Sequence, residues 1–125
     1  MHSKWWRVVE FSHSSIARLS PKGGLKPNEI GAYLGGDLLN QCISTSFAAR
    51  QLGWQTIGIY GACSTMAEGI LLSAALIESE LEKRAVCSAS SHFCTAERQY
   101  RFPLEYGGVR PLTSQWTATA CGALV

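Results

Sequence analysis

Cys63 is the residue whose type and placement most favour chemistry. It lies between an expected strand, Thr56 to Tyr60, and an expected helix, Thr65 to Glu82. Free backbone amides and the dipole at a helix start stabilise a thiolate, which is the reactive form of a thiol. Cys63 is therefore a candidate nucleophile or ligand-binding residue. The alternative is a small buried hydrophobic residue, the commonest role of a free cysteine.

Asp37 belongs to a second polar stretch, Gly36 to Gln41, which follows another expected strand. Ligands of open α/β sheets bind at the carboxyl ends of the strands. Asp37 could therefore orient a ligand or a hydrogen-bond donor. The alternative is that Asp37 or Asn40 caps the helix that comes next.

A third polar stretch, Ser90 to Gln99, follows a third expected strand. His92 is a candidate base, and His92 with Cys94 could bind a metal. A metal site needs three or four ligands at matched spacing, and no such set is evident, so we expect neither a metal nor a cofactor. Arginines that could hold a carboxylate in bidentate contacts are Arg98, Arg101 and Arg110. Pairing with glutamates on a solvated loop is the alternative.

The elements that must position these residues alternate between strand and helix. The sequence predicts helices at Gln41 to Leu52 and Thr65 to Glu82, and strands at Ile30 to Leu34, Thr56 to Tyr60, Ala85 to Ala89 and within Thr117 to Val125. This order favours right-handed βαβ units and a mostly parallel sheet with helices on its faces. The expected class is therefore α/β.

The two predicted helices carry end signals. Gly53 is placed as a C-terminal cap of the first helix. Thr65 and Glu68 have the spacing of a capping box at the start of the second helix. The apolar residues of this second helix cover almost its whole circumference, which is typical of a buried central helix.

Composition excludes several classes of protein. With 125 residues, 46% of them hydrophobic, the chain forms one compact domain. A net charge of +2 without basic runs gives no indication of nucleic-acid binding. The five cysteines form no CxxC pair and no secretory signal precedes them, which predicts reduced thiols in the cytosol.

No stretch approaches the ~20 apolar residues of a membrane span. No GxGxxG, P-loop or GxSxG motif supports nucleotide binding or serine hydrolysis.

Three stretches of the chain together resemble the stage V sporulation protein AD family. They are Gly36 to Gln41, Gly61 to Thr65, and Ser90 to Gly108, the last with Ala96-Glu97-Arg98-Gln99 and Glu105-Tyr106-Gly107-Gly108. Each motif alone is weak, but they occur in order at the family's spacing. The similarity begins near Gly24 and runs to the end of the chain. The resemblance implies a thiolase-like fold.

The same resemblance implies a function in sporulation. Proteins of this family bind dipicolinic acid (pyridine-2,6-dicarboxylic acid) and work with the membrane proteins of the same operon to move it into the developing spore. It also implies a cytoplasmic protein peripheral to the spore inner membrane. The residues we assign to the ligand are Asp37, Cys63, His92 and Arg98. By analogy with other thiolase-fold proteins, we expect a homodimer and no nucleic-acid partner.

Cys63 also falls where thiolases and ketoacyl synthases carry their acyl-accepting nucleophile. The alternative function is therefore an acyl-transferring condensing enzyme with a catalytic Cys63, although fold does not establish activity. A thiolase fold has two similar halves, and the second supplies the groups that activate this cysteine. We expect residues 24–125 to be a partial, N-terminal thiolase-like domain without a complete catalytic set. We expect residues 1–23 to be an atypical leader, disordered or frameshifted. A third hypothesis is a non-functional remnant.

Overall fold

The computed structural model describes residues 26–92, 112–113 and 118–125. Helices and strands alternate in these residues, as the sequence predicts. In chain order the elements are a 3-10 turn (Pro27–Glu29), β1 (Ala32–Asp37), α2 (Ile43–Leu52), β2 (Thr56–Gly58), a second 3-10 turn (Ala62–Ser64), α3 (Thr65–Glu78), β3 (Ala85–Ser91) and β4 (Ala120–Leu124).

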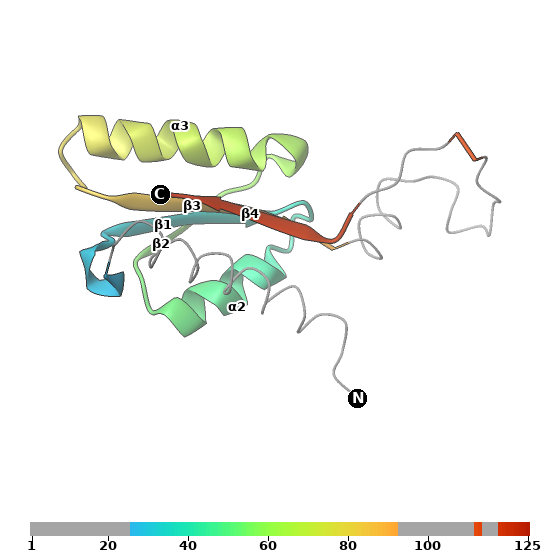
Figure 1. The fold of residues 1–125 in the computed structure, drawn as a ribbon, viewed down its shortest axis with the longest axis horizontal. Coiled ribbons are helices and arrows are strands. Elements are labelled where there is room, and N and C mark those ends of the chain that lie inside the picture. Colours follow the sequence, from blue (N-terminus) through green and yellow to red (C-terminus); the bar gives the residue numbers. More distant parts are fainter. Residues whose placement is uncertain (1–25, 93–111, 114–117) are drawn as a thin grey trace.

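The described strands form one sheet in the order β2-β1-β3-β4 (Figure 1). β1 pairs in parallel with β2 on one side and with β3 on the other, and β4 pairs antiparallel with β3. The chain thus crosses over in opposite directions after β1 and after β2. Crossovers of one hand in opposite directions place their helices on opposite faces, and Figure 1 shows α3 on one face and α2 on the other. The predicted α/β class, with a mostly parallel sheet and βαβ units, is confirmed.

β1 continues beyond the glycine pair at which the sequence predicts its end. It runs through Gly35 and Gly36 to Asp37, and all six of its residues are buried. A Cβ atom on Gly36 would lie 2.3 Å from the carbonyl oxygen of Ile59 and 2.6 Å from Cγ2 of Thr65. These glycines therefore do not break the strand. The missing side chain of Gly36 lets the backbone that follows β2 lie directly against β1, and the missing side chain of Gly35 leaves room for Thr45 and Tyr33.

The helix ends agree with the sequence at some points and differ at others. Gly53 caps α2 as predicted, with φ 67° and its N–H donating to the carbonyl oxygen of Ala49 at 2.9 Å. α3 ends at Glu78 and not at Glu82, because the chain turns through a left-handed residue, Glu80, with φ 59°. β2 is also shorter than predicted and ends at Gly58.

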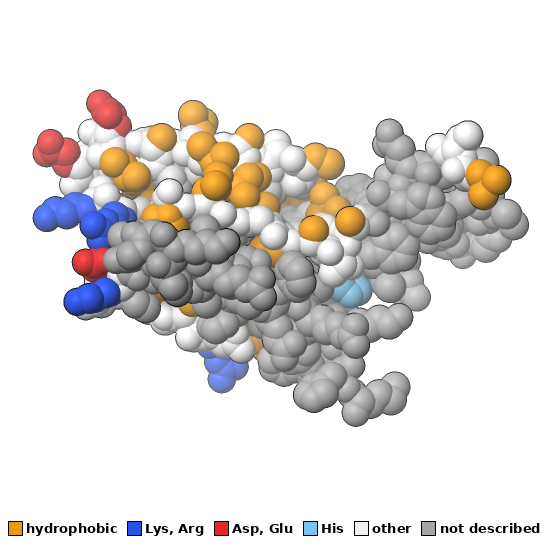
Figure 2. Space-filling model, viewed as in Figure 1, with side chains coloured by type: hydrophobic (Ala, Val, Ile, Leu, Met, Phe, Trp, Pro, Cys, Tyr) orange, Lys and Arg blue, Asp and Glu red, His pale blue; other side chains and the backbone are white. Residues whose placement is uncertain are grey.

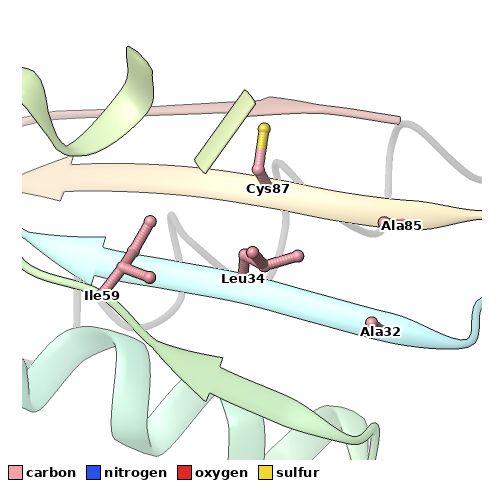
Figure 3. Packing of buried hydrophobic residues seen from close by; sticks show 5 residues of the cluster. All are labelled: Ala32, Leu34, Ile59, Ala85 and Cys87. Carbon is pink, nitrogen blue, oxygen red and sulfur yellow. The ribbon is translucent and has the colours of Figure 1, made fainter. Parts of the chain in front are cut away.

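The core on the α3 side of the sheet is made of small and branched side chains (Figure 3). Its buried members are Ala32, Leu34, Ile59, Ala85 and Cys87. Met66 and Leu76 of α3 pack against them. Complete burial of a side chain such as Leu34 contributes roughly 2–3 kcal/mol to stability. Cys87 is a buried core residue, and this burial raises the pKa of its thiol.

The core on the α2 side is centred on Tyr33. Its buried residues are Ile30, Tyr33 and Val86, packed against Ala49, Leu52, Trp54 and Ala123. The Tyr33 hydroxyl shares a 2.7 Å hydrogen bond with Oγ of Ser88. Burial raises the pKa of Tyr33 to about 12, which the bond to Ser88 only partly offsets. Tyr33 therefore stays neutral over the physiological pH range.

α3 is buried on its sheet side only, and not all round as its composition predicts. Thr65, Gly69 and Ser73, spaced four residues apart, are its buried residues. A Cβ on Gly69 would lie 3.0 Å from Cβ of Cys87, so the helix approaches the sheet through small side chains. The large apolar residues point away, and Leu71 is 71% exposed. The reason for the difference is that, in the part of the chain that the structure describes, nothing packs over this outer side.

Candidate functional site

The described parts of the three polar stretches singled out in the sequence, which for the third stretch are residues 90–92, lie at one edge of the sheet. Asp37 at the end of β1 is in register with Ser90 near the end of β3. The N–H of Leu38 donates to the carbonyl oxygen of Ser90 at 2.8 Å. Cys63 lies in the 3-10 turn that follows β2 and leads into α3. This is the edge at which open α/β sheets bind ligands.

Asp37 is buried, and both oxygens of its carboxylate accept hydrogen bonds. Oδ2 accepts from the backbone N–H groups of Ser44 at 2.8 Å and Thr45 at 3.3 Å. Oδ1 accepts from the hydroxyls of Thr45 at 2.9 Å and Ser90 at 2.5 Å. One carboxylate thus joins the end of β1, the first turn of α2 and the end of β3.

These contacts match the helix-capping alternative for Asp37. The residue at the N-cap position of α2 is Cys42, which has a left-handed backbone (φ 48°) and makes no side-chain bond to the helix. Asp37 caps the first turn from the neighbouring strand instead. Of the two residues that the sequence offered as caps, Asp37 and Asn40, the structure thus shows Asp37 in this position. The ligand-binding role of Asp37 stays a prediction.

The turn that carries Cys63 is held in place by its own hydrogen bonds. The N–H and Oγ of Ser64 both donate to the carbonyl oxygen of Gly61, at 2.9 and 2.8 Å. The hydroxyl of Thr65 accepts from the N–H of Gly61 at 3.1 Å and donates to the carbonyl oxygen of Ala62 at 2.9 Å. Cys63 itself is exposed. A fixed turn therefore presents an accessible thiol directly before α3.

The predicted capping box between Thr65 and Glu68 is wrong. The hydroxyl of Thr65 is used within the turn, as described above, and the N-cap residue is Ser64, which makes no side-chain bond to the helix. Oε2 of Glu68 is buried, and no described residue donates a hydrogen bond to it. Thr65 cannot serve as the cap because it already lies inside the helix, one residue later than the spacing rule assumes.

His92 and Cys42 complete the polar groups at this edge. His92 is buried directly after β3. Cys42 is half-buried, and its Sγ lies 3.8 Å from the carbonyl oxygens of Leu39 and Ile59. The sequence did not single out Cys42 for the site. The signal that could have identified it is its position directly after the Asp37 stretch, which ends at Gln41.

Arg98, predicted to bind the ligand, lies outside the described residues, as do Arg101, Arg110, Cys94 and the predicted leader, residues 1–23. Within the described residues, no three side chains of His, Cys, Asp or Glu come together as a metal site. No helix in the same part of the chain has both the length and the apolar character needed to cross a membrane.

Comparison with known proteins shows which protein family this chain is similar to. The sequence model of stage V sporulation protein AD (SpoVAD) matches residues 9–125, so the similarity begins upstream of Gly24. The stage V sporulation protein AD of Bacillus subtilis (strain 168) is 38% identical over 126 residues, which cover 99% of this chain and 37% of that protein. The chain therefore spans little more than a third of the length of this relative.

Solved structures share the fold at low sequence identity. MvaS in complex with 3-hydroxy-3-methylglutaryl coenzyme A superposes with a TM-score of 0.56 at 20% identity, over 67% of this chain and 22% of that chain. A tetronic acid condensing enzyme superposes with a TM-score of 0.57 at 14% identity, over 72% of this chain and 30% of that chain. Together with the mostly parallel sheet, these neighbours confirm the predicted thiolase-like fold.

Proposed function

Because the chain belongs to the stage V sporulation protein AD family, we propose that it serves sporulation by binding dipicolinic acid and supporting its uptake into the developing spore. The observation that supports a binding function is the meeting of the Asp37, Cys63 and His92 stretches at the carboxyl edge of a parallel sheet. The chain spans 37% of the length of the B. subtilis relative, so the function of the whole protein is a proposal for this part of it.

The electrostatics of this edge suit a dicarboxylate. α3 begins here at Thr65, and the amino end of a helix carries a partial positive charge. The amino end of α2, which also lies here, is already bound by the Asp37 carboxylate. The side chain of Ser64 does not cap α3, so the start of this helix beside Cys63 suits an anionic ligand. A guanidinium from Arg98 would add a bidentate contact to one carboxylate.

Asp37 would act on the ligand indirectly. A second negative charge beside a dicarboxylate is unfavourable, and both oxygens of Asp37 are already hydrogen-bonded within the fold. We infer that Asp37 holds Ser90 and the start of α2 in place, so that the surrounding donors keep their positions. This assigns Asp37 to the architecture of the site.

Titration calorimetry of the chain with dipicolinic acid tests the proposal. We expect Arg98→Ala to weaken binding about tenfold or more, because a hydrogen bond to a charged group contributes roughly 1.5–3 kcal/mol. The matched control is Arg50→Ala, which removes an exposed arginine from the far end of α2. Cys63→Ala should also weaken binding, whereas Ser79→Ala, at the opposite end of α3, should not. Absence of binding, or equal affinity in all four variants, would contradict the proposal.

The place of action is part of the same proposal. Membership of the family supports a protein that works at the cytoplasmic side of the spore inner membrane with the membrane proteins of its operon. Fractionation of sporulating cells, with the chain followed by antibody, tests this. Recovery in the membrane fraction only when the other products of the operon are present would support it, and recovery that does not depend on them would speak against it.

Acyl transfer is the second candidate function, and the exposed thiol of Cys63 at the start of α3 favours it. One structural neighbour is a condensing enzyme and another holds a coenzyme A ester, although at 14% and 20% identity they share only the fold. Incubation with acyl-coenzyme A followed by intact-mass and peptide analysis distinguishes the two functions. A thioester on Cys63 that is lost in Cys63→Ala would support acyl transfer. An unmodified Cys63 would leave ligand binding as the better proposal.

A non-functional remnant, the third hypothesis from the sequence, would expose half of a core and aggregate. A cooperative thermal transition of the isolated chain would exclude it.

A further inference from the structure

Glu68 is a charged residue at the ligand edge that the proposed function leaves without a role. It lies in the first turn of α3 and is half-buried. Its Oε2 atom is buried, and no described residue donates a hydrogen bond to it. A buried carboxylate oxygen without a donor is costly, because its contact with water is lost and not replaced. Such an exception in a folded protein requires an explanation, and one explanation is a proton that is taken up when a ligand binds.

The carboxyl group of Glu68 lies against the turn that presents Cys63. Its Oε2 is 3.1 Å from the point at which a Cβ atom on Gly61 would stand, and Gly61 is the residue that opens this turn. Oγ of Ser64 lies beside the same point, but its single proton is donated to the carbonyl oxygen of Gly61 at 2.8 Å. The unbonded oxygen of Glu68 therefore lies next to the turn that is assigned to the ligand.

The described residues place no lysine or arginine at this edge. Those that the structure describes lie before β1, in the last turn of α2 and directly before β3, toward the amino ends of the strands: Lys26, Arg50, Lys83 and Arg84. Figure 2 shows the lysine and arginine side chains of the face in view gathered toward the left, the end at which β1 and β3 of Figure 1 begin. Within the described part of the chain, the charge of Glu68 is thus not neutralised by a basic side chain.

A dicarboxylate beside Cys63 would bring its negative charges close to the carboxylate of Glu68. Carboxylates in a partly buried site repel each other, and a single proton held between two of them removes most of this repulsion. Asp37 is not the acceptor of this proton, because both of its oxygens already accept hydrogen bonds within the fold. The unbonded oxygen of Glu68 is the carboxylate oxygen that can accept it.

We propose that Glu68 takes up a proton when dipicolinic acid binds and donates it in a hydrogen bond to a carboxylate of the ligand; this inference rests on the proposed function. The chain with an ionised Glu68, the dianionic ligand and one proton from solvent combine to form the complex. The oxygen that has no donor in the free chain thereby becomes a donor itself. A hydrogen bond from a carboxyl group to a carboxylate is short and roughly twice as strong as one between neutral groups.

Other titratable groups lie around the start of α3, and a test has to separate them from Glu68. They are Asp37 of β1, Cys42, Tyr60, Cys63, Cys87 of β3, His92 and Cys121 of β4. An imidazole is the group of this set that most often exchanges a proton near neutral pH. His92 is therefore the competing acceptor.

Titration calorimetry in two buffers counts the proton. Binding of dipicolinic acid is measured near neutral pH in PIPES, which has a low enthalpy of ionisation, and in Tris, which has a high one, because the observed enthalpy then reports the protons drawn from the buffer. We expect uptake of about one proton per ligand by the parent chain and none by Glu68→Gln, whose amide donates to the ligand without a proton from solvent. The matched control is Glu78→Gln, the same substitution at the exposed far end of α3, which should keep the uptake.

The pH profile of binding gives a second readout, which a purely structural role of Glu68 would not change. The association constant of the parent chain should fall by up to about tenfold for each pH unit above neutral, because the complex holds one proton more than the separate partners. Glu68→Gln should lose this dependence and bind at least as tightly as the parent at alkaline pH. Glu68→Met, which is similar in size but has no donor, should bind about tenfold more weakly than Glu68→Gln. Circular dichroism confirms that each variant is folded.

Three outcomes would overturn the inference, and they differ in what they leave standing. Binding by the parent chain without uptake of a proton would overturn it and leave the proposed function intact. Uptake that persists in Glu68→Gln would assign the proton to another group, with His92 the first to examine. Absence of any binding by the parent chain would overturn the proposed function and this inference together.

Discussion

Replacing Asp37 should separate its structural role from a role in ligand binding. We expect Asp37→Ala to lower the free energy of unfolding by roughly 3–5 kcal/mol and Asp37→Asn to lower it by only about 1 kcal/mol. Asp37 is buried and accepts four hydrogen bonds, so the two variants leave different numbers of donors without a partner.

Most of the stability loss expected for Asp37→Ala comes from two backbone N–H groups. Alanine leaves the N–H groups of Ser44 and Thr45 without their acceptor, and each buried unpaired donor costs about 1–3 kcal/mol. The hydroxyls of Thr45 and Ser90 lose an acceptor too, but they can rotate toward other groups. The small cavity left by the side chain adds to the loss.

Asparagine keeps most of these contacts. With its oxygen toward the two N–H groups, its NH₂ group faces the hydroxyls of Thr45 and Ser90, which can accept as well as donate. The geometry is thus preserved without the charge. If Asp37→Asn folds normally and still binds dipicolinic acid, the carboxylate is architectural. If it folds normally and loses binding, the charge itself acts in the site.

Urea unfolding followed by circular dichroism measures these free energies. All variants are compared at one protein concentration, because any self-association would change the apparent stability. Ser90→Ala serves as the control, since it removes a single hydroxyl of the network and should cost about 1 kcal/mol. An Asp37→Ala variant within 1 kcal/mol of the parent, or an Asp37→Asn variant as unstable as Asp37→Ala, would refute the hydrogen-bond argument.

Three further predictions address the fold. Gly36→Ala should lower the unfolding free energy by about 3 kcal/mol or prevent folding, because its Cβ would meet the Ile59 carbonyl oxygen at 2.3 Å; a normal urea midpoint would contradict this. Tyr33 has its pKa raised to about 12, so stability should be full below pH 10 and fall as the pH rises toward 12, and Tyr33→Phe should flatten this alkaline loss in thermal melts. The pKa of the Glu29 carboxyl is lowered, chiefly by the hydrogen bond from the backbone N–H of Lys26. Its small contribution to folding stability is therefore present above its ordinary pKa and is lost as the pH falls through the lowered pKa. Glu29→Gln should reduce that acid sensitivity, and an unchanged acid profile would show that the carboxylate contributes nothing.

The sequence was sufficient for the order of elements because that order follows from local patterns. Gly53 ends α2 as its type indicates, and the β-branched residues around Ile57 mark β2. Gly35 and Gly36 misled the prediction of β1, because a glycine pair ends a strand in some proteins and permits close packing in others. At Gly36 the answer depends on Ile59, a residue more than 20 positions away, and single-sequence patterns do not record such contacts.

The candidate site was predictable in position but not in its contacts. Asp37, the Cys63 turn and residues 90–92 each follow a strand, and parallel strands bring their carboxyl ends to one edge. The bond from Ser90 to Asp37 joins residues 53 positions apart, and the left-handed backbone of Cys42 is rare for its residue type. Neither leaves a signal in local composition.

Main-chain contacts fix where the Cys63 turn stands relative to the sheet. The N–H of Ile59 donates to the carbonyl oxygen of Gly35 at 3.0 Å, and the turn itself is closed by a bond from the N–H of Ser64 to the oxygen of Gly61. Such contacts make few demands on side-chain identity, apart from the missing one at Gly36. Apart from Gly36 and the hydroxyls of Ser64 and Thr65, the neighbouring side chains could therefore change without moving the thiol. Backbone contacts of this kind tolerate extensive sequence change, in keeping with a fold that is shared with the structural neighbours at 14–20% identity.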